Sequence, residues 1–247
     1  REVYKATRVF EYYSAQSYEP LEQLFLTRMV NRGDFNLQLY LIELEHAFRE
    51  FEDTFGLPSS RLEIISLKND ILQIPRLDVT GDNSALTEAE RTQMFRNELS
   101  NVDRLDEDGY FTLPFATRTE RLALLTFNHK ISYIEVEIIG GGQGDLLARI
   151  YLRMAGTSTA QMPGTSEPLF YTFPKRLAVI QPFFGGSRPA HIDPLVFQGL
   201  ILNDRPPLNS RWEFVLNTYD EEVNKDLNLQ SLDDIRLYVH YSDFTEF

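Results

Sequence analysis

The amino-acid sequence predicts a mainly β protein, an antiparallel β-sandwich of jelly-roll type preceded by an N-terminal helical segment. Apolar residues recur at every third or fourth position up to residue 56, and at every second position beyond it. The alternating segments follow one another with few helices between them, so a parallel sheet built from crossover helices is not expected. We therefore expect a helical lead-in at residues 1–56 and a β-sandwich domain at residues 57–247.

The strongest helix prediction in the lead-in covers residues 35–55. Gly56 ends this helix and Pro58 lies just beyond it, which is the usual stop signal. Shorter helices are expected at residues 2–16 and 21–30. The apolar face of the long helix consists of Leu37, Leu41, Leu44, Phe48, Phe51 and Phe55.

The sequence of residues 57–247 predicts a series of strands and one helix. The helix, at residues 86–100, begins with a capping box in which Thr87 is followed three residues later by Glu90. Residues 155–168, in which Gly-Thr-Ser occurs twice, are expected to form a polar loop. The strands are expected at residues 61–67, 71–75, 110–115, 130–139, 146–155, 169–174, 176–183, 211–217 and 234–243.

A glycine-rich stretch separates two of these strands. Gly140, Gly141, Gly142 and Gly144 could suggest a phosphate-binding loop, but such a loop continues with Gly-Lys-Ser/Thr and a helix. Here Asp145 follows instead, and its charge would repel a phosphate. Because glycine readily adopts positive φ, we interpret this stretch as a turn between strands.

The overall charge limits the classes of partner. The 247 residues carry a formal charge of −13, which disfavours nucleic acid and anionic membrane surfaces. No run of 18 apolar residues occurs, so no transmembrane helix is expected. The absence of cysteine excludes disulfides and thiol chemistry but leaves the compartment open, secretion included. Because the chain starts at Arg1 without an initiator methionine, we expect it to be a fragment of a larger protein.

Two acidic loops raise the question of a bound ion. Residues 78–83 contain Asp78, Asp82 and Asn83, whereas residues 103–108 contain Asp103, Asp106, Glu107 and Asp108. An EF-hand loop requires a glycine at position 6 and a glutamate at position 12. If Gly109 takes position 6, Phe115 takes position 12, which excludes that motif. We expect solvated turns, with an ion site of another type left as the alternative.

Glu135 and Glu137 lie two residues apart on one expected strand, so both project from the same face. Glycoside hydrolases use two carboxylates, but these flank the substrate across a cleft. We therefore expect the pair to form the wet side of a strand whose other side packs inward through Ile134, Val136 and Ile138.

The remaining candidates for chemistry are scattered. The histidines are His46, His129, His191 and His240, and no two have the spacing of metal ligands. No catalytic site, cofactor or metal is expected. Trp212 and the many tyrosines suggest a carbohydrate-binding module as an alternative function, although Trp212 shares an apolar face with Phe214 and Leu216 and is expected in the core.

Two strand motifs resemble the C-terminal region of the A component of insecticidal Tc toxin complexes. The first motif lies at Lys130–Ile138 and the second at Ser231–Tyr241. Their matching residues are Lys130, Ile131, Ile134, Val136 and Ile138, then Ser231, Leu232, Asp234, Ile235, Leu237, Val239 and Tyr241. The resemblance implies a β-rich domain that receives a partner subunit within a large assembly. We therefore expect a non-catalytic protein-interaction module, with glycan binding as the alternative.

Overall fold

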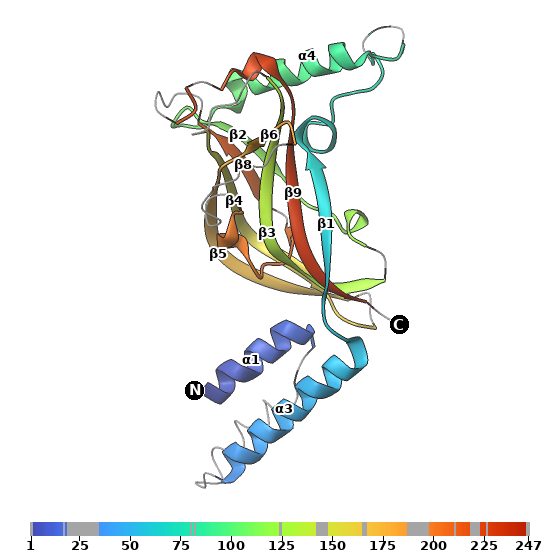
Figure 1. Cartoon of the computed structure of the whole chain (residues 1–247), viewed down its shortest axis with the longest axis vertical. Helices are drawn as coiled ribbons and strands as arrows, with labels where there is room; N and C mark the ends of the chain where they lie inside the picture. Colours follow the sequence, from blue (N-terminus) through green and yellow to red (C-terminus); the bar gives the residue numbers. More distant parts are fainter. Residues whose placement is uncertain are drawn as a thin grey trace.

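The computed structural model of the chain describes residues 2–16, 18, 35–79, 81, 83–123, 125–141, 148–164, 167–186, 198–209, 211–217, 223–225 and 227–245. Within these residues the protein is mainly β, with helices preceding a two-sheet sandwich (Figure 1). The fold class predicted from the sequence is therefore correct. None of the helices described is long and apolar enough to cross a membrane.

The helical segment comprises α1 (Glu2–Ser14) and α3 (Phe35–Phe55), which lie beside one another below the sandwich (Figure 1). Gly56 follows α3 with a φ of +72°, and its N–H bonds to the carbonyl of Glu52, so the predicted stop is confirmed. The helix expected at residues 21–30 lies outside the described residues. An aromatic cluster joins the two helices to the sandwich through Phe10, Leu44, Phe51, Phe127 and Phe244.

Nine strands are described in the sandwich. They are β1 (Ser59–Ser66), β2 (Phe111–Phe115), β3 (Thr126–Gly140), β4 (Ile150–Gln161), β5 (Pro168–Ile180), β6 (Phe183–Phe184), β7 (Leu208–Asn209), β8 (Trp212–Leu216) and β9 (Leu232–Thr245). One sheet has the order β1-β9-β3-β6 and the other the order β2-β8-β4-β5, with β7 beside β4. All pairings are antiparallel except that of β3 with β6.

The inward rows of both sheets form one apolar core. Ile134, Val136 and Ile138 face inward from β3, as their alternation predicted. Trp212, Phe214 and Leu216 do so from β8, which confirms their expected place. Burial of these rows is the main contribution to the stability of the sandwich.

A cap closes one end of the sandwich. It contains the π-helix η1 (Leu67–Ile71) and the helix α4 (Glu88–Leu99), whose capping box between Thr87 and Glu90 is present as predicted. Short 3-10 turns complete the connections: η2 (Val102–Arg104), η3 (Thr119–Arg121), η4 (Leu200–Leu202) and η5 (Leu229–Ser231).

Several predicted elements differ from the structure. The strand expected at residues 71–75 is absent, because the chain coils into η1 and then bends. Residues 155–161 belong to β4 instead of a polar loop. The strands expected at 169–174 and 176–183 form the single strand β5 up to Ile180, with a bulge where its pairing shifts opposite Met154 and Gly156.

The glycine-rich stretch lies between β3 and β4, as the interpretation of a turn between strands predicted. Gly140 and Gly141 have φ near +80°, as a change of direction requires. Strand β3 belongs to the first sheet and β4 to the second, so the connection passes from one layer to the other. Residues 142–147, including Gly144 and Asp145, lie outside the described residues.

Candidate functional site

The two carboxylates singled out in the sequence lie on the outer face of β3. Glu135 Oε2 is 3.0 Å from His240 Nε2, and the His240 ring stacks on Tyr133 with centroids 4.1 Å apart. Glu137 accepts hydrogen bonds from the hydroxyl of Tyr238 at 2.6 Å and the N–H of Gly186 at 2.9 Å. The predicted common face is correct, but the predicted wet environment is wrong, since Glu135 is 1% and Glu137 7% exposed.

The geometry of this pair explains its burial. A buried carboxylate is costly unless hydrogen bonds satisfy its oxygens. The donors come from β9 and from the turn after β6, so each carboxylate joins neighbouring segments of the sheet. The arrangement resembles a scaffold of cross-strand contacts more than a pair that flanks a substrate.

In the two acidic loops, aspartate side chains accept hydrogen bonds from backbone N–H groups of the same loop. Asp78 accepts from the N–H of Gly81 at 3.0 Å, and Asp106 accepts from the N–H groups of Asp108 and Tyr110 at 3.1 and 2.9 Å. These are bonds that order turns. In the described part of the chain no group of three histidine, aspartate or glutamate side chains is disposed to hold a metal ion. Asp82 lies outside that part.

The histidines occupy three different environments. His46 is exposed on α3, whereas His129 is buried with Nε2 2.8 Å from the hydroxyl of Thr126. Burial, with a smaller contribution from the positive charge of Arg61, lowers the pKa of His129 to about 4. His240 pairs with Glu135 as described above, and His191 lies outside the described residues. The structure therefore brings none of the described histidines together.

Trp212 lies in the core at 2% exposure. Its ring stacks on Phe115 with centroids 5.8 Å apart, and its indole N–H donates to the carbonyl of Pro207. A sugar-binding tryptophan presents its face to solvent, so this residue does not supply the platform that suggested glycan binding.

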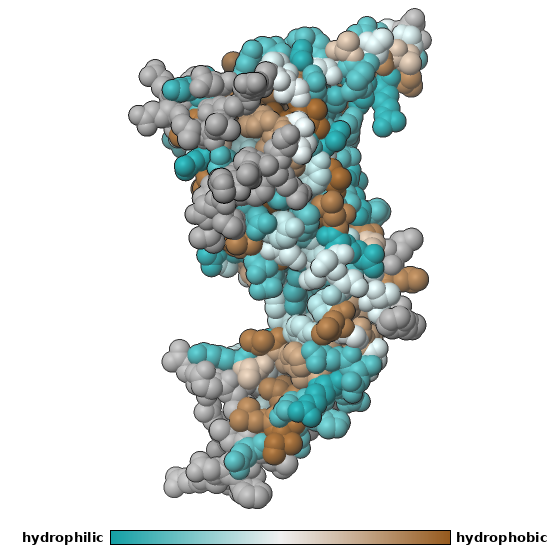
Figure 2. All heavy atoms as spheres, viewed as in Figure 1, coloured by the Kyte–Doolittle hydropathy of each residue, from teal (hydrophilic) through white to brown (hydrophobic). Residues whose placement is uncertain are grey.

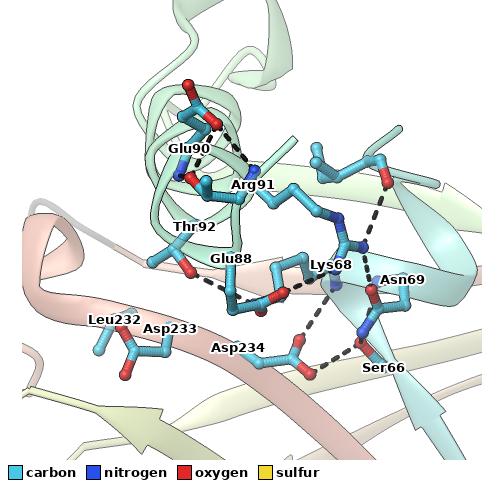
Figure 3. A network of polar contacts seen from close by, with 12 residues as sticks. Ser66, Lys68, Asn69, Glu88, Glu90, Arg91, Thr92, Leu232, Asp233 and Asp234 are labelled. Atoms are coloured by element: carbon cyan, nitrogen blue, oxygen red, sulfur yellow. Dashed lines mark hydrogen bonds and ion pairs between the residues drawn. The ribbon is translucent and has the colours of Figure 1, made fainter. Parts of the chain in front are cut away.

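Sequence reasoning missed a polar network that fixes the cap on the sandwich (Figure 3). At its centre the carboxylate of Asp234 on β9 accepts from the hydroxyl of Ser66 at 2.7 Å and the N–H of Lys68 at 3.1 Å. Asp234 belongs to the second strand motif, but only the fold shows that Ser66 and Lys68 lie beside it. The network thus ties η1 to the last strand.

The same network reaches α4 through Lys68. This side chain is 5% exposed, and its ammonium is 2.5 Å from the carboxylate of Glu88 (Figure 3). Arg91 also contacts Glu88, at 2.8 Å, and donates to the carbonyl of Pro75. The hydrogen bond from Lys68 lowers the pKa of Glu88. The network therefore links η1, α4 and β9 to one another.

A cleft of about 930 Å³ separates α1 from the sandwich. Its wall includes Lys130, whose ammonium lies 3.9 Å from the centroid of the Tyr12 ring and donates to the Tyr12 carbonyl. Tyr12 also packs edge-on against Tyr171 of β5. Burial lowers the pKa of Lys130 to about 8, although Asp204 acts against this. The aromatic face in the cleft is thus already occupied by a cation from the same chain.

Two apolar side chains on β5 point to solvent. Phe170 is 69% exposed and lies opposite Thr159, and Leu177 is 42% exposed and lies opposite Arg153. Both positions belong to the outer face of the β2-β8-β4-β5 sheet. Apolar residues are also exposed on the helical pair, where Figure 2 shows brown surface among polar groups.

Comparison with known proteins gives only remote similarity. No protein-family model and no curated protein matches the chain. Among solved structures, it is similar to the cryo-EM structure of Yersinia pseudotuberculosis TcaA-TcaB, with 13% identity and a TM-score of 0.40 over 85% of this chain and 11% of that chain. It is also similar to Morganella morganii TcdA4, with 17% identity and a TM-score of 0.38 over 83% of this chain and 8% of that chain. The chain thus spans about a tenth of the length of each.

Proposed function

We propose that this chain is a non-catalytic protein-interaction module of a larger toxin-like protein, and that it docks a partner subunit through its β-sandwich. The observation that carries the proposal is the contrast between two sets of side chains. The polar residues considered for chemistry, Glu135, Glu137 and Asp106, bind their own scaffold. Phe170 and Leu177, by contrast, are apolar and face solvent on a strand.

The surface that fits docking is the outer face of the five-stranded sheet around β5. A rigid sheet presents side chains at little cost in conformational entropy, and aromatic residues contribute strongly to protein interfaces. The resemblance of the two strand motifs to the A component of Tc toxins also supports a role in a multi-subunit assembly. Both motifs lie in the opposite sheet, on β3 and on the segment ending in β9, which leaves this face available.

Capture from an extract of the source cells tests the proposal. The chain should retain a partner protein, and replacing Phe170 and Leu177 by glutamate should weaken retention about 30-fold, as for loss of an interface hot spot. Val102→Glu is the matched control, because Val102 is 73% exposed and lies on η2, outside the strands of this sheet. If the variant with both Phe170 and Leu177 replaced retains the partner as strongly as the wild type does, this result would contradict the proposed docking surface. Binding on a glycan array without any captured protein would favour the carbohydrate alternative.

A further inference from the structure

Strand β1 is an edge of its sheet. It pairs with β9 along Ser59–Ser66, and no strand within the described residues pairs with its other side (Figure 1). A free edge offers a row of backbone donors and acceptors to another strand.

The direction of these backbone groups follows from two contacts. The carbonyl of Ile64 accepts from Arg121 at 3.4 Å, and the N–H of Ser66 donates to Asp70 at 2.7 Å. Both partners lie on the side away from β9. Because the pattern in an antiparallel ladder repeats every second residue, the N–H and C=O of Leu62 also point to the free side. Leu62 and Ile64 are 46% and 43% exposed.

We infer that the occupant of this edge is β1 of a second copy of the chain, paired antiparallel with Leu62 on a two-fold axis. In this register Arg61 of each copy lies opposite Glu63 of the other, so opposite charges face each other on both sides of the axis. If one strand slides by two residues relative to the other, either Arg61 lies opposite Arg61 or Glu63 lies opposite Glu63. Both arrangements bring like charges together, which is unfavourable. Charge complementarity therefore selects the register centred on Leu62.

The ends of the strand fit the same register. Ser66 lies opposite Pro58 of the other copy, and proline has no N–H to donate. The N–H of Ser66 is already bonded to Asp70, so neither end leaves a donor unsatisfied. Arg121 must release the carbonyl of Ile64, but it keeps its contacts with Glu63 and Asp70.

Ion pairs within each chain would be continued by the charge pairs across this interface. Arg61 contacts Asp243 at 2.7 Å, and Glu63 contacts Arg121 at 2.8 Å within one chain. Pairing would align these groups into a row of alternating charge. The edge of β1 is separate from the β5 face, so dimerisation and partner docking can fail independently.

Sedimentation velocity of the full chain over a range of concentrations tests the dimer. The wild type should form a dimer, whereas Leu62→Lys and Leu62→Glu should each weaken it about tenfold or more, because like charges meet on the axis. An equimolar mixture of the two variants should restore a dimer, because the lysine of one copy then lies opposite the glutamate of the other. This rescue is specific to a residue that faces its own copy.

Two further variants keep the test decisive. Leu62→Pro removes only the N–H on the free side, so it should abolish the dimer while the pairing with β9 and the circular dichroism spectrum are retained. The chain has no cysteine, so Leu62→Cys should form a disulfide-linked dimer on mild oxidation, whereas the exposed control Val102→Cys should remain monomeric. A wild type that is monomeric at all concentrations, or a dimer that persists in Leu62→Pro, would overturn the inference.

Discussion

The imidazole of His129 lies in the sandwich interior, where it is costly to protonate. Burial lowers its pKa from the ordinary value of 6.5 to about 4. The unfolded chain therefore binds a proton here before the folded chain does, so the folded state loses stability as the pH falls from about 6.5 to about 4. The shift corresponds to at most about 3 kcal/mol. Above pH 6.5 the residue makes no pH-dependent contribution.

We expect His129→Gln to flatten this acid slope, because an amide can bond to Thr126 but does not titrate in this range. Urea unfolding at pH 7 and pH 4.5 measures the difference. The raised pKa of the buried Asp243 acts in the opposite direction, but it is common to both proteins and cancels in the comparison. Equal loss of stability in the variant and the wild type would show that His129 is not the titrating group.

At the scale of elements, the cap depends on the contact between a buried ammonium and an exposed carboxylate. Lys68 is almost fully buried, and Glu88 of α4 is its carboxylate partner. Glu88→Ala should reduce the free energy of unfolding by about 1–3 kcal/mol, because the ammonium then remains buried without its counter-charge. Urea unfolding at pH 7 measures this loss.

A double-mutant cycle separates the ion pair from the rest of α4. In Lys68→Met with Glu88→Ala the buried ammonium of Lys68 is no longer present without its partner, so part of the stability should return. Glu107→Ala is the control, since Glu107 is exposed in a turn and should change stability by less than about 0.5 kcal/mol. Purely additive losses in the cycle would show that Lys68 and Glu88 do not interact.

Local sequence signals predicted the elements whose cause is local. The capping box at Thr87 and Glu90 fixes the start of α4, and Gly56 fixes the end of α3, because both act through neighbouring backbone groups. The prediction of a strand at residues 71–75 was wrong because the conformation there depends on a residue that is distant in the chain. The η1 turn before this segment is held by Asp234, which is more than 160 residues away in the chain. Its environment could not be inferred from the segment itself.

The burial of side chains outside the core was the other feature that the sequence did not predict. Alternation placed Ile134 and Val136 inward correctly, because the inner rows of a sandwich are apolar. The same alternation predicted a wet face for Glu135. It could not show that His240, on which Tyr133 stacks, contacts the carboxylate of Glu135, since the partners of an outer face depend on strand order.

At the scale of the whole molecule, strand order also decides which residues meet. β3 and β4 follow one another closely in the chain, but β9 lies beside β3 and β8 lies beside β4. Strands that are distant in the chain, such as β1 and β9, are thus paired, whereas the consecutive strands β3 and β4 lie in different layers. Two-layer architecture followed from composition and period alone, but the pairing within each layer required the three-dimensional structure.

The division of the chain at residues 56 and 57 remains a prediction, and the aromatic contacts between α3 and the sandwich provide a way to test it. Phe51 and Phe55 of α3 pack against Phe127, and Phe51 also packs against Phe244, with ring centroids 5.0 to 6.5 Å apart. If residues 57–247 are a domain, this segment should unfold in a single cooperative transition and keep its near-ultraviolet circular dichroism. It should also bind a hydrophobic dye, because removal of α3 exposes Phe127 and Phe244.

Replacing Phe127 and Phe244 by threonine in residues 57–247 should remove the dye binding while the cooperative transition remains. Threonine keeps the preference for strands but not the apolar surface. The sandwich core lies in the separate cluster that contains Ile134 and Trp212, so these two changes leave it intact. Gradual, non-cooperative unfolding of residues 57–247 would instead make α1 and α3 part of the same folding unit, because the sandwich would then need their aromatic cluster to fold.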